Sequence, residues 1–269
     1  MNHQKPTLIG ILNVTPDSFS DGGIYFSLDA ALSHGEKLIK DGADIIEIGG
    51  ESTRPGSSPI TEDEEIKRVL PVVQALAPLT TVSVDTFRAN TAKQCLEAGA
   101  KIINDVSALR FNPELASVIA DFDAKVILMH SKESGQSPHA SEGKKEYKDV
   151  VKEIADFLLT QSELALLAGV KKENIILDPG MGRFISENPN YSWEVLRRFD
   201  ELVSLTAPYP CLVSTSRKGF LGGPLEKRDI TSQLTSLWAY EKGAKYIRVH
   251  NIDMARQCLF ALEELRKIN

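Results

Sequence analysis

Short apolar runs alternate with amphipathic stretches along the whole chain. Eight such runs occur: TLIGILN, DIIEIGG, TTVSVD, KIINDVS, KVILMH, NIILDP, PCLVST and KYIRVHN. They are nearly continuous in apolar residues, as expected for strands with both faces buried in a parallel sheet. Between them, apolar residues recur at three- and four-residue spacing, which predicts amphipathic helices. The clearest sets are Leu28, Ala31, Leu32, Leu38 and Ile39; Ile66, Val69, Leu70 and Val73; Val195, Leu196, Phe199 and Leu202; and Leu259, Leu262 and Leu265.

Three of the apolar runs share a preceding phrase. DGADIIEIGG begins at Asp41, AGAKIINDVS at Ala98 and KGAKYIRVHN at Lys242. Each has Gly-Ala before the apolar run and polar residues after it. Glycine suits the left-handed position that follows many helices. Each phrase therefore reads as a helix end that leads into a buried strand.

This alternation of strand and helix has a specific structural meaning. Repeated eight times in 269 residues, it predicts an α/β protein with a single (β/α)8 TIM barrel domain over residues 1–269. The alternative is a doubly wound open sheet, but no GxGxxG phrase follows the first strand. No linker, low-complexity tract or second domain interrupts the pattern.

The composition does not alter the predicted fold, but it limits the kinds of binding partner to expect. Hydrophobic residues make up 42% of the chain and charged residues 25%, which is ordinary for a soluble globular protein. The net charge of -6 gives no reason to expect a nucleic-acid or membrane surface. The three cysteines form no CxxC pair, and neither a signal peptide nor a membrane-spanning stretch is evident. We therefore expect a cytoplasmic protein with no nucleic-acid or membrane partner.

Polar residues follow every apolar run, at the end of a barrel where active sites lie. They are Asn13; Glu51, Ser52, Thr53 and Arg54; Asp85; Asn104 and Asp105; His130; Asp178; Ser216, Arg217 and Lys218; and Arg248, His250 and Asn251. The cations, hydroxyls and Asn13 suit a phosphorylated group and a metal ion. Asp85, Asn104 and Asp178 suit the N–H and carbonyl edge of a heteroaromatic base. The set predicts a site for a flat nitrogen heterocycle that carries a phosphate ester.

Two loops at this end have unusual compositions. NVTPDSFSDGG (Asn13–Gly23) and GGESTRPGSSP (Gly49–Pro59) are long and rich in glycine, serine and proline. Either they are simply solvated connections, or they are lids that close over a reacting centre. Their position at the catalytic end favours lids.

Seven phrases together resemble the motifs of the dihydropteroate synthase family, in that family's order. They are GILNVTPDSFSDGG, DIIEIGGESTRPG, SVDT, IINDVS, ILDPGMG, SRK and RVH, and they span essentially the whole chain. The resemblance implies that 4-aminobenzoate is joined to 6-hydroxymethyl-7,8-dihydropterin diphosphate with release of pyrophosphate. It also implies Mg²⁺ as cofactor, a (β/α)8 barrel and a homodimer.

The resemblance also implies roles for individual residues. Asp85, Asn104 and Asp178 would bind the pterin edge. Lys218 would meet the pterin carbonyl and ring nitrogen, and Arg248 would lie against the pterin face. With His250, Arg248 would also help to hold the diphosphate. The catalytic residues would then be Asp85, Lys218, Arg248 and His250.

Other matching positions belong to the metal and to the second substrate. Asn13 would be the metal-side ligand on the first loop. Gly219 would lie beside the aminobenzoate pocket. The second loop would supply three residues near the diphosphate and aminobenzoate: Thr53, Arg54 and Pro55.

The implied reaction suits these groups. 4-Aminobenzoate is a weak nucleophile that is neutral at physiological pH, so departure of the diphosphate is the difficult step. Mg²⁺ and cations would neutralise charge on the leaving group. The pterin ring would delocalise a carbocation, which nearby carboxylates favour. We therefore expect an SN1-like transfer without a covalent enzyme intermediate.

Two other functions compete with this one. A pterin-dependent methyltransferase barrel would bind a related ring, but it would not need Asn13, Arg248 and His250 for a diphosphate. A non-catalytic pterin-binding homologue would have lost charged site residues, which this chain keeps. Both alternatives rank below the synthase.

The chain departs from the family's usual motifs near the second substrate. Gly219 and Phe220 follow SRK, where serine is usual, and GMGRFISENPN (Gly180–Asn190) is longer than usual. MHSKESGQS (Met129–Ser137) and Asn251 also differ from the common form. These segments resemble sulfonamide-insensitive members of the family, so we expect the pocket to exclude sulfonamides.

Two polar residues keep two interpretations each, and a third has no assigned role. His130 either caps a buried turn or takes part in catalysis. Arg217 is either a ligand or a structural ion-pair former. Arg183, in the unusual segment after the sixth strand, has no assigned role.

Overall fold

The computed structural model describes residues 5–15, 28–52, 58–132 and 144–267, and its strands form one ring. The strands are β1 (Thr7–Asn13), β2 (Ile45–Gly49), β3 (Thr81–Asp85), β4 (Ile102–Asp105), β5 (Lys125–Met129), β6 (Ile175–Asp178), β7 (Leu212–Val213) and β8 (Tyr246–Val249). All neighbouring pairs are parallel, in the order β6-β5-β4-β3-β2-β1-β8-β7. A bridge from Leu177 to Cys211, next to β7, joins the two ends. The predicted (β/α)8 barrel is confirmed.

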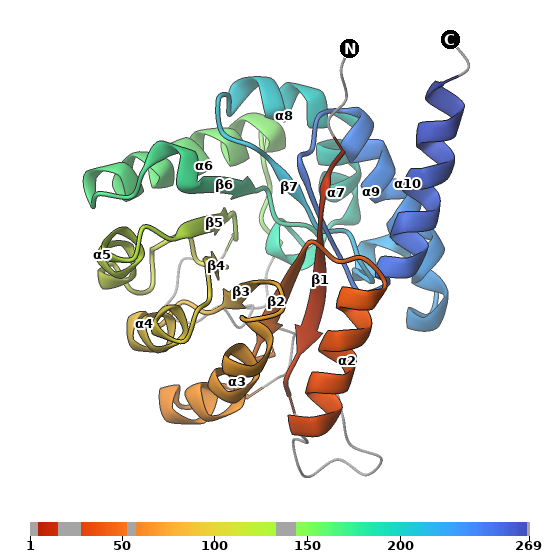
Figure 1. Ribbon diagram of the computed structural model, residues 1–269. Coiled ribbons are helices and arrows are strands. Elements are labelled where there is room, and N and C mark those ends of the chain that lie inside the picture. The colour runs from red at the N-terminus through yellow and green to blue at the C-terminus, as the bar shows by residue number, and fades with distance from the viewer. Residues whose placement is uncertain (1–4, 16–27, 53–57, 133–143, 268–269) are drawn as a thin grey trace.

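Helices surround this ring (Figure 1). They are α2 (Leu28–Lys40), α3 (Glu62–Leu76), α4 (Ala89–Glu97), α5 (Glu114–Asp121), α6 (Val150–Leu167), α7 (Pro189–Arg197), α8 (Phe199–Leu205), α9 (Arg228–Glu241) and α10 (Ile252–Arg266). The pattern from Val195 to Leu202 predicted one helix, and the structure has two. Arg198 leaves the helical conformation between α7 and α8, at φ -107° and ψ 29°. Its guanidinium pairs with Glu194 and Glu201, one from each helix.

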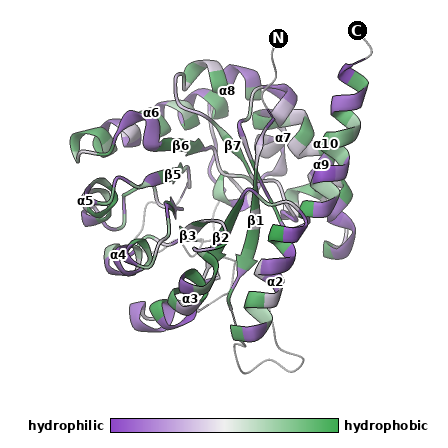
Figure 2. Ribbon diagram, viewed as in Figure 1, coloured by the Kyte–Doolittle hydropathy of each residue, from purple (hydrophilic) through white to green (hydrophobic). Residues whose placement is uncertain are grey.

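The two sides of each strand belong to different parts of the core. Side chains alternate along a strand, so Ile46 and Ile48 of β2 point away from Ile45. Ile46 and Ile48 belong to the large cluster between strands and helices, which includes Val69 and Val73 of α3. Figure 2 shows the matching pattern of apolar strands and two-sided helices. A smaller cluster fills the barrel itself: Ile9, Ile45, Ile102, Ile127, Ile176 and Leu212.

The barrel interior changes from apolar to polar along the strands. Two residues after the apolar layer, the same side of the strand carries buried polar residues: Glu47 after Ile45, Asn104 after Ile102, Asp178 after Ile176, and Ser214 after Leu212. Arg248 follows Tyr246 in the same way. The apolar layer therefore closes the amino end of the barrel, and polar groups line its carboxyl end.

Arg88 links the two ends of the loop between β2 and α3. Its guanidinium donates to Glu51 Oε2 at 2.6 Å and to the Ile60 carbonyl at 2.9 Å. It also lies 3.0 Å from Oε2 of Glu65, a carboxylate of α3 that is 1% exposed. One half-buried cation thus contacts both described flanks of residues 53–57.

Candidate active site

The ends of β3 and β4 bring Asp85 and Asn104 together, as predicted. Asn104 Nδ2 donates to Asp85 Oδ1 at 2.9 Å. The buried Asn104 Oδ1 has no hydrogen-bond partner among the described residues, so it is an acceptor directed into the site. Burial, and next the Glu47 carboxylate, raise the pKa of Asp85 to about 7. This carboxyl group can change charge near neutral pH.

The Arg248 guanidinium lies in the barrel and contacts a side chain through each of its three nitrogens. Nη2 donates to Asp178 Oδ2 at 2.7 Å, Nη1 to Glu47 Oε2 at 3.1 Å, and Nε to Ser214 Oγ at 3.3 Å. Asp178 also accepts from the Gly180 backbone through Oδ1, at 2.8 Å. Arg248 and Asp178 are therefore paired before any ligand binds. The edge of the guanidinium is occupied, which leaves its planar faces for stacking.

Lys218 comes directly before a short 3-10 turn, η3 (Gly219–Leu221). Its ammonium lies 4.4 Å from the centre of the Phe184 ring. Burial, and next Arg248, lower the pKa of Lys218 to about 8, while neighbouring carboxylates oppose this shift. Phe220 packs on Trp193 with ring centres 5.2 Å apart. Gly219 faces open space, because a Cβ there would meet no atom within 4 Å.

His250 and Asn13 lie at two other strand ends. His250 Nδ1 is 2.8 Å from Ser216 Oγ, and that hydroxyl also accepts from the His250 backbone at 3.1 Å. Asn13 is in register with Gly49 of β2. A Cβ at Gly49 would be in van der Waals contact with Asn13 Oδ1 and with the Cβ of Asp85, each at 3.6 Å, so Asn13 and Asp85 both lie beside Gly49.

The structure separates Arg217 from Lys218. Arg217 has φ 58°, a left-handed conformation that is uncommon for a residue with a side chain. Its guanidinium makes two hydrogen bonds to Asp229 of α9, at 2.7 and 2.9 Å. The structure thus places Arg217 in an ion pair, which was one of its two predicted roles.

His130 and Arg183 differ in their surroundings. Burial lowers the pKa of His130 to about 3, so the ring is neutral. The ring packs edge-on against Phe157, and the backbone N–H of His130 donates to the Asp178 carbonyl at 2.8 Å. These contacts fit the capping role better than catalysis. Arg183 is exposed, within η2 (Gly182–Phe184).

Several predicted residues lie outside the described residues. Thr53, Arg54 and Pro55 are among them, as is much of each predicted lid. The assignments of these three residues and the lid hypothesis therefore stay predictions.

Glu47 is a site residue that the sequence reasoning missed. It is 5% exposed and pairs with Arg248 from the opposite end of the chain. Burial is the main reason that its pKa is raised, and Arg248 opposes that shift. A signal was present in the sequence, because a charged residue in the middle of the apolar run DIIEIGG needs a buried partner.

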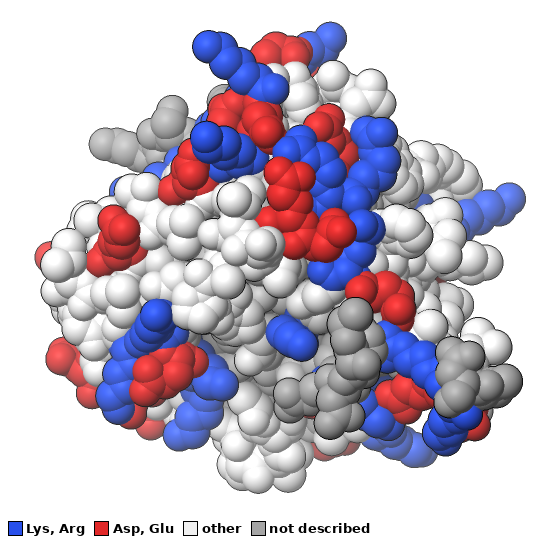
Figure 3. Space-filling model, turned by 90° about the horizontal axis from the view of Figure 1, so that it is seen from above, with Lys and Arg blue, Asp and Glu red and all other residues white. Residues whose placement is uncertain are grey.

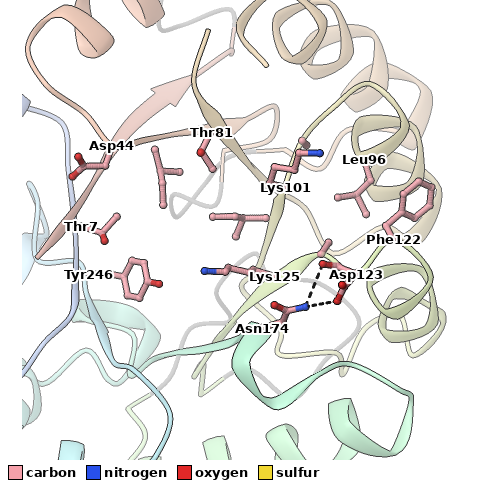
Figure 4. A pocket seen from close by; sticks show the side chains of 14 residues that line it. Thr7, Asp44, Thr81, Leu96, Lys101, Phe122, Asp123, Lys125, Asn174 and Tyr246 are labelled. Carbon is pink, nitrogen blue, oxygen red and sulfur yellow. Dashed lines mark hydrogen bonds between the residues drawn. The ribbon is translucent and has the colours of Figure 1, made fainter. Parts of the chain in front are cut away.

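A hollow of about 500 Å³ lies at the other end of the barrel (Figure 4). Residues at or just before strand starts line it, including Thr7, Asp44, Thr81 and Tyr246. None of the predicted site residues within the described ranges lines this hollow. The face in Figure 3 carries interspersed acidic and basic side chains, without one large patch of either sign.

Comparison with known proteins identifies the family. The family described as "Pterin binding enzyme" matches residues 9–250. A dihydropteroate synthase of Staphylococcus haemolyticus is 42% identical over 257 residues, covering 93% of this chain and 91% of the relative.

Two solved structures of Xanthomonas albilineans dihydropteroate synthase are also similar. The one with 4-aminobenzoic acid has TM-score 0.89 and 35% identity, over 97% of this chain and 93% of the other. The one with 7,8-dihydropteroate has TM-score 0.85 and 33% identity, over 99% and 95%. The chain therefore belongs to the dihydropteroate synthase family of pterin-binding enzymes, which are transferases of folate biosynthesis.

Proposed function

We propose that this chain joins 4-aminobenzoate to 6-hydroxymethyl-7,8-dihydropterin diphosphate at the carboxyl ends of its strands, giving 7,8-dihydropteroate and pyrophosphate. One observation carries the proposal. Asp85, Asn104, Asp178, Lys218 and Arg248 line one end of the barrel interior, and a buried Asn104 oxygen has no partner among the described residues. This mixture of donors, acceptors and a planar cation matches a pterin ring.

The pterin-binding roles follow from these contacts. Asp85 and Asp178 would accept from the N–H groups of the ring, and the free Asn104 oxygen would accept another. Lys218 would donate to the pterin carbonyl and ring nitrogen. Arg248 would stack on the ring, because its edge nitrogens already bind other side chains.

The diphosphate would lie beyond the ring, toward His250 and Asn13. Mg²⁺ commonly takes few protein oxygens and completes its shell with water and substrate phosphates. Asn13 Oδ1 and Asp85 Oδ2 lie 3.6 and 3.7 Å from the position that a Cβ at Gly49 would take, so two oxygens of the kind that Mg²⁺ prefers converge there. Among the described residues, no three His, Cys, Asp or Glu side chains could hold a metal ion together. Asn13 would therefore share Mg²⁺ with the diphosphate, and the ion would neutralise charge on this leaving group.

The transfer would follow an SN1-like route. The carbon–oxygen bond to the diphosphate breaks, and its electron pair leaves with pyrophosphate. The carboxylates of Asp85 and Asp178 favour the carbocation that remains on the pterin. The 4-aminobenzoate nitrogen then forms the carbon–nitrogen bond and loses a proton to water. Thr53, Arg54, Pro55 and Gly219 would border the aminobenzoate.

A coupled pyrophosphate assay tests the proposed reaction. Rapid, sustained pyrophosphate release should require both substrates and Mg²⁺, and chelation should abolish it; the pterin diphosphate alone should lose its diphosphate only slowly. A methyltransferase or a non-catalytic homologue would release none. Loss of diphosphate from the pterin without 4-aminobenzoate supports the SN1-like route. Inversion together with a strict dependence on nucleophile strength contradicts that route.

We also propose that the aminobenzoate pocket excludes sulfonamides. The aromatic rings of Phe184 and Phe220 flank the chain around Lys218 and Gly219, where the sequence departs from the usual motif. Sulfonamides extend beyond 4-aminobenzoate, so aromatic side chains at this position would hinder them. Submicromolar inhibition by sulfamethoxazole with normal turnover would show that this part of the proposal is wrong.

The apolar surface of α9 supports a homodimer, which we propose as the assembly. Ile230, Leu234 and Trp238 recur every four residues along this helix and are 72%, 67% and 51% exposed. Phe260 of α10 is 64% exposed. A second copy would cover these side chains. Light scattering should give twice the chain mass, and Leu234→Asp should give monomers.

A cytoplasmic location is proposed from the cysteines. Cys95, Cys211 and Cys258 are all free thiols, as expected in a reducing compartment. Fractionation of cells that express the full chain tests the location. Separately, no helix in the described ranges is both long and apolar enough to span a bilayer.

A further inference from the structure

We propose that Glu47 is a positioning residue of the pterin site: it holds one edge of the Arg248 guanidinium, so that Arg248 offers its flat face to the heterocycle. This inference rests on the proposed function, because that proposal is what places Arg248 against the pterin.

The position of Glu47 in β2 requires a specific partner. It lies between Ile46 and Ile48, which face the helices, and it follows Ile45 on the inner side of the strand. A carboxylate at such a buried position is stable only with a cation or hydrogen-bond donors. Arg248 Nη1, at 3.1 Å, supplies both. Of the residues that the structure describes, Arg248 is the one that bonds to the Glu47 carboxylate.

The guanidinium of Arg248 is held from three directions. Ser214 Oγ accepts from Nε at 3.3 Å, Asp178 from Nη2 at 2.7 Å, and Glu47 from Nη1. Partners on all three nitrogens define the plane of a guanidinium, whereas one partner would leave it free to rotate. The nitrogens at the edge of the guanidinium therefore all bond to side chains of the barrel wall. The face of the guanidinium is left for stacking on a flat ring.

Glu47 is the partner whose effect on Arg248 can be isolated. Asp178 also accepts from Gly180 and is itself a proposed pterin ligand, so its replacement would remove several interactions. Ser214 makes only a long, neutral contact. Replacing Glu47 releases one edge of Arg248 and removes none of the side chains proposed to contact the pterin.

Glu47→Gln tests the proposal, because it removes the charge and keeps the size. The KM for the pterin diphosphate should rise about tenfold, the effect of weakening one hydrogen bond between charged groups, while the KM for 4-aminobenzoate stays unchanged. Calorimetry with 6-hydroxymethylpterin should show the same loss of affinity without any turnover. Glu47→Asp keeps the charge and should recover part of that affinity.

Glu65→Gln is the matched control. Glu65 is also a buried carboxylate paired with an arginine, but its partner is Arg88. This variant should lose stability as Glu47→Gln does, yet bind 6-hydroxymethylpterin like the parent. Equal losses of affinity in the two variants would show that Glu47 acts through the fold alone.

A double-mutant cycle with Arg248→Lys separates positioning from direct contact. If Glu47 acts through the planar edge of Arg248, Glu47→Gln should have little further effect once lysine replaces that arginine. Additive losses would overturn the inference, and so would unchanged affinity in the single variant. If Glu47→Gln does not fold, Glu47→Asp takes its place in the cycle. Absence of pyrophosphate release from the parent chain would instead count against the proposed function.

Discussion

Arg88→Met should destabilise the fold in a way that depends on pH. Arg88 lies 3.0 Å from Glu65 Oε2, and their side chains are 15% and 1% exposed. Methionine fills a similar volume but leaves the Glu65 carboxylate without its cation. Thr86 and Thr91 still donate to that carboxylate, at 3.1 and 2.8 Å. The charge therefore keeps two neutral donors but loses its counter-ion.

The size of the effect follows from that arrangement. Removing one partner of a buried ion pair typically costs about 3–5 kcal/mol. The two threonine hydroxyls place Arg88→Met near the lower figure, about 3 kcal/mol at pH 7. For a chain of this size that loss lowers the melting temperature by about 6–12 °C.

The pH dependence gives the stricter test. Burial is the main reason that the pKa of Glu65 is raised, and Arg88 opposes that shift. Without Arg88 the pKa in the folded state rises further, so the folded variant holds a proton that the unfolded chain releases. Stability of the variant then falls as the pH rises from the unfolded value of 4.5 through the folded pKa. The loss relative to the parent should be small in acid and largest at neutral pH.

Urea unfolding followed by tryptophan fluorescence measures these losses at several pH values. Adding Glu65→Gln to Arg88→Met should recover most of the stability, because no charge is then left unpaired. Arg256→Met is the control: its pair with Asp44 is more exposed, at 34% and 43%, and should contribute about 1 kcal/mol or less. An Arg88→Met loss that is the same at all pH values, or that Glu65→Gln does not relieve, would refute the reasoning.

Two further predictions concern the site. The kcat/KM for the pterin diphosphate should rise as the pH increases through about 7, because the pKa of Asp85 is raised to about 7 and its ionised form favours the carbocation. Asp85→Asn should lower kcat/KM and abolish this rise with pH. If the rise persists in the variant, a group other than Asp85 causes it. Gly180→Ala should cost about 2 kcal/mol or more in urea unfolding, because φ is 67° and the new Cβ would lie 2.4 Å from the His130 carbonyl oxygen. Gly219→Ala is its control and should change stability by about 0.5 kcal/mol or less, since open space surrounds that position, and equal losses would argue against the steric cause.

The barrel was predictable because its signals are local. The apolar run of each strand and the Gly-Ala phrase before three of them depend only on neighbouring residues. Asp85 and Asn104 were predictable for a related reason, since parallel strands bring their carboxyl ends to one edge. The break at Arg198 was not, because apolar periodicity continues through it and the arginine's own ion pairs decide the conformation.

Contacts that form only when the barrel closes could not be predicted from the sequence. Glu47 and Arg248 are separated by 201 positions, and they meet only because β8 pairs with β1. Arg217 and Lys218 are adjacent and alike in charge, yet the left-handed backbone at Arg217 directs its side chain to Asp229, while the Lys218 ammonium lies over the Phe184 ring. Their spacing in the sequence therefore could not assign the two roles.

The same contacts explain why this end of the barrel depends on a ligand for its full set of interactions. Burial raises the pKa of Asp85 and lowers the pKa of Lys218, so both charged forms are disfavoured in the free protein. The buried Asn104 Oδ1 and Ser83 Oγ have no partner in the described part of the chain. A ring with N–H donors would satisfy such acceptors, and a developing positive charge would stabilise the carboxylates. Strand packing and the Arg248 ion pairs therefore hold groups whose desolvation a bound ligand would offset, most fully when positive charge develops on the pterin.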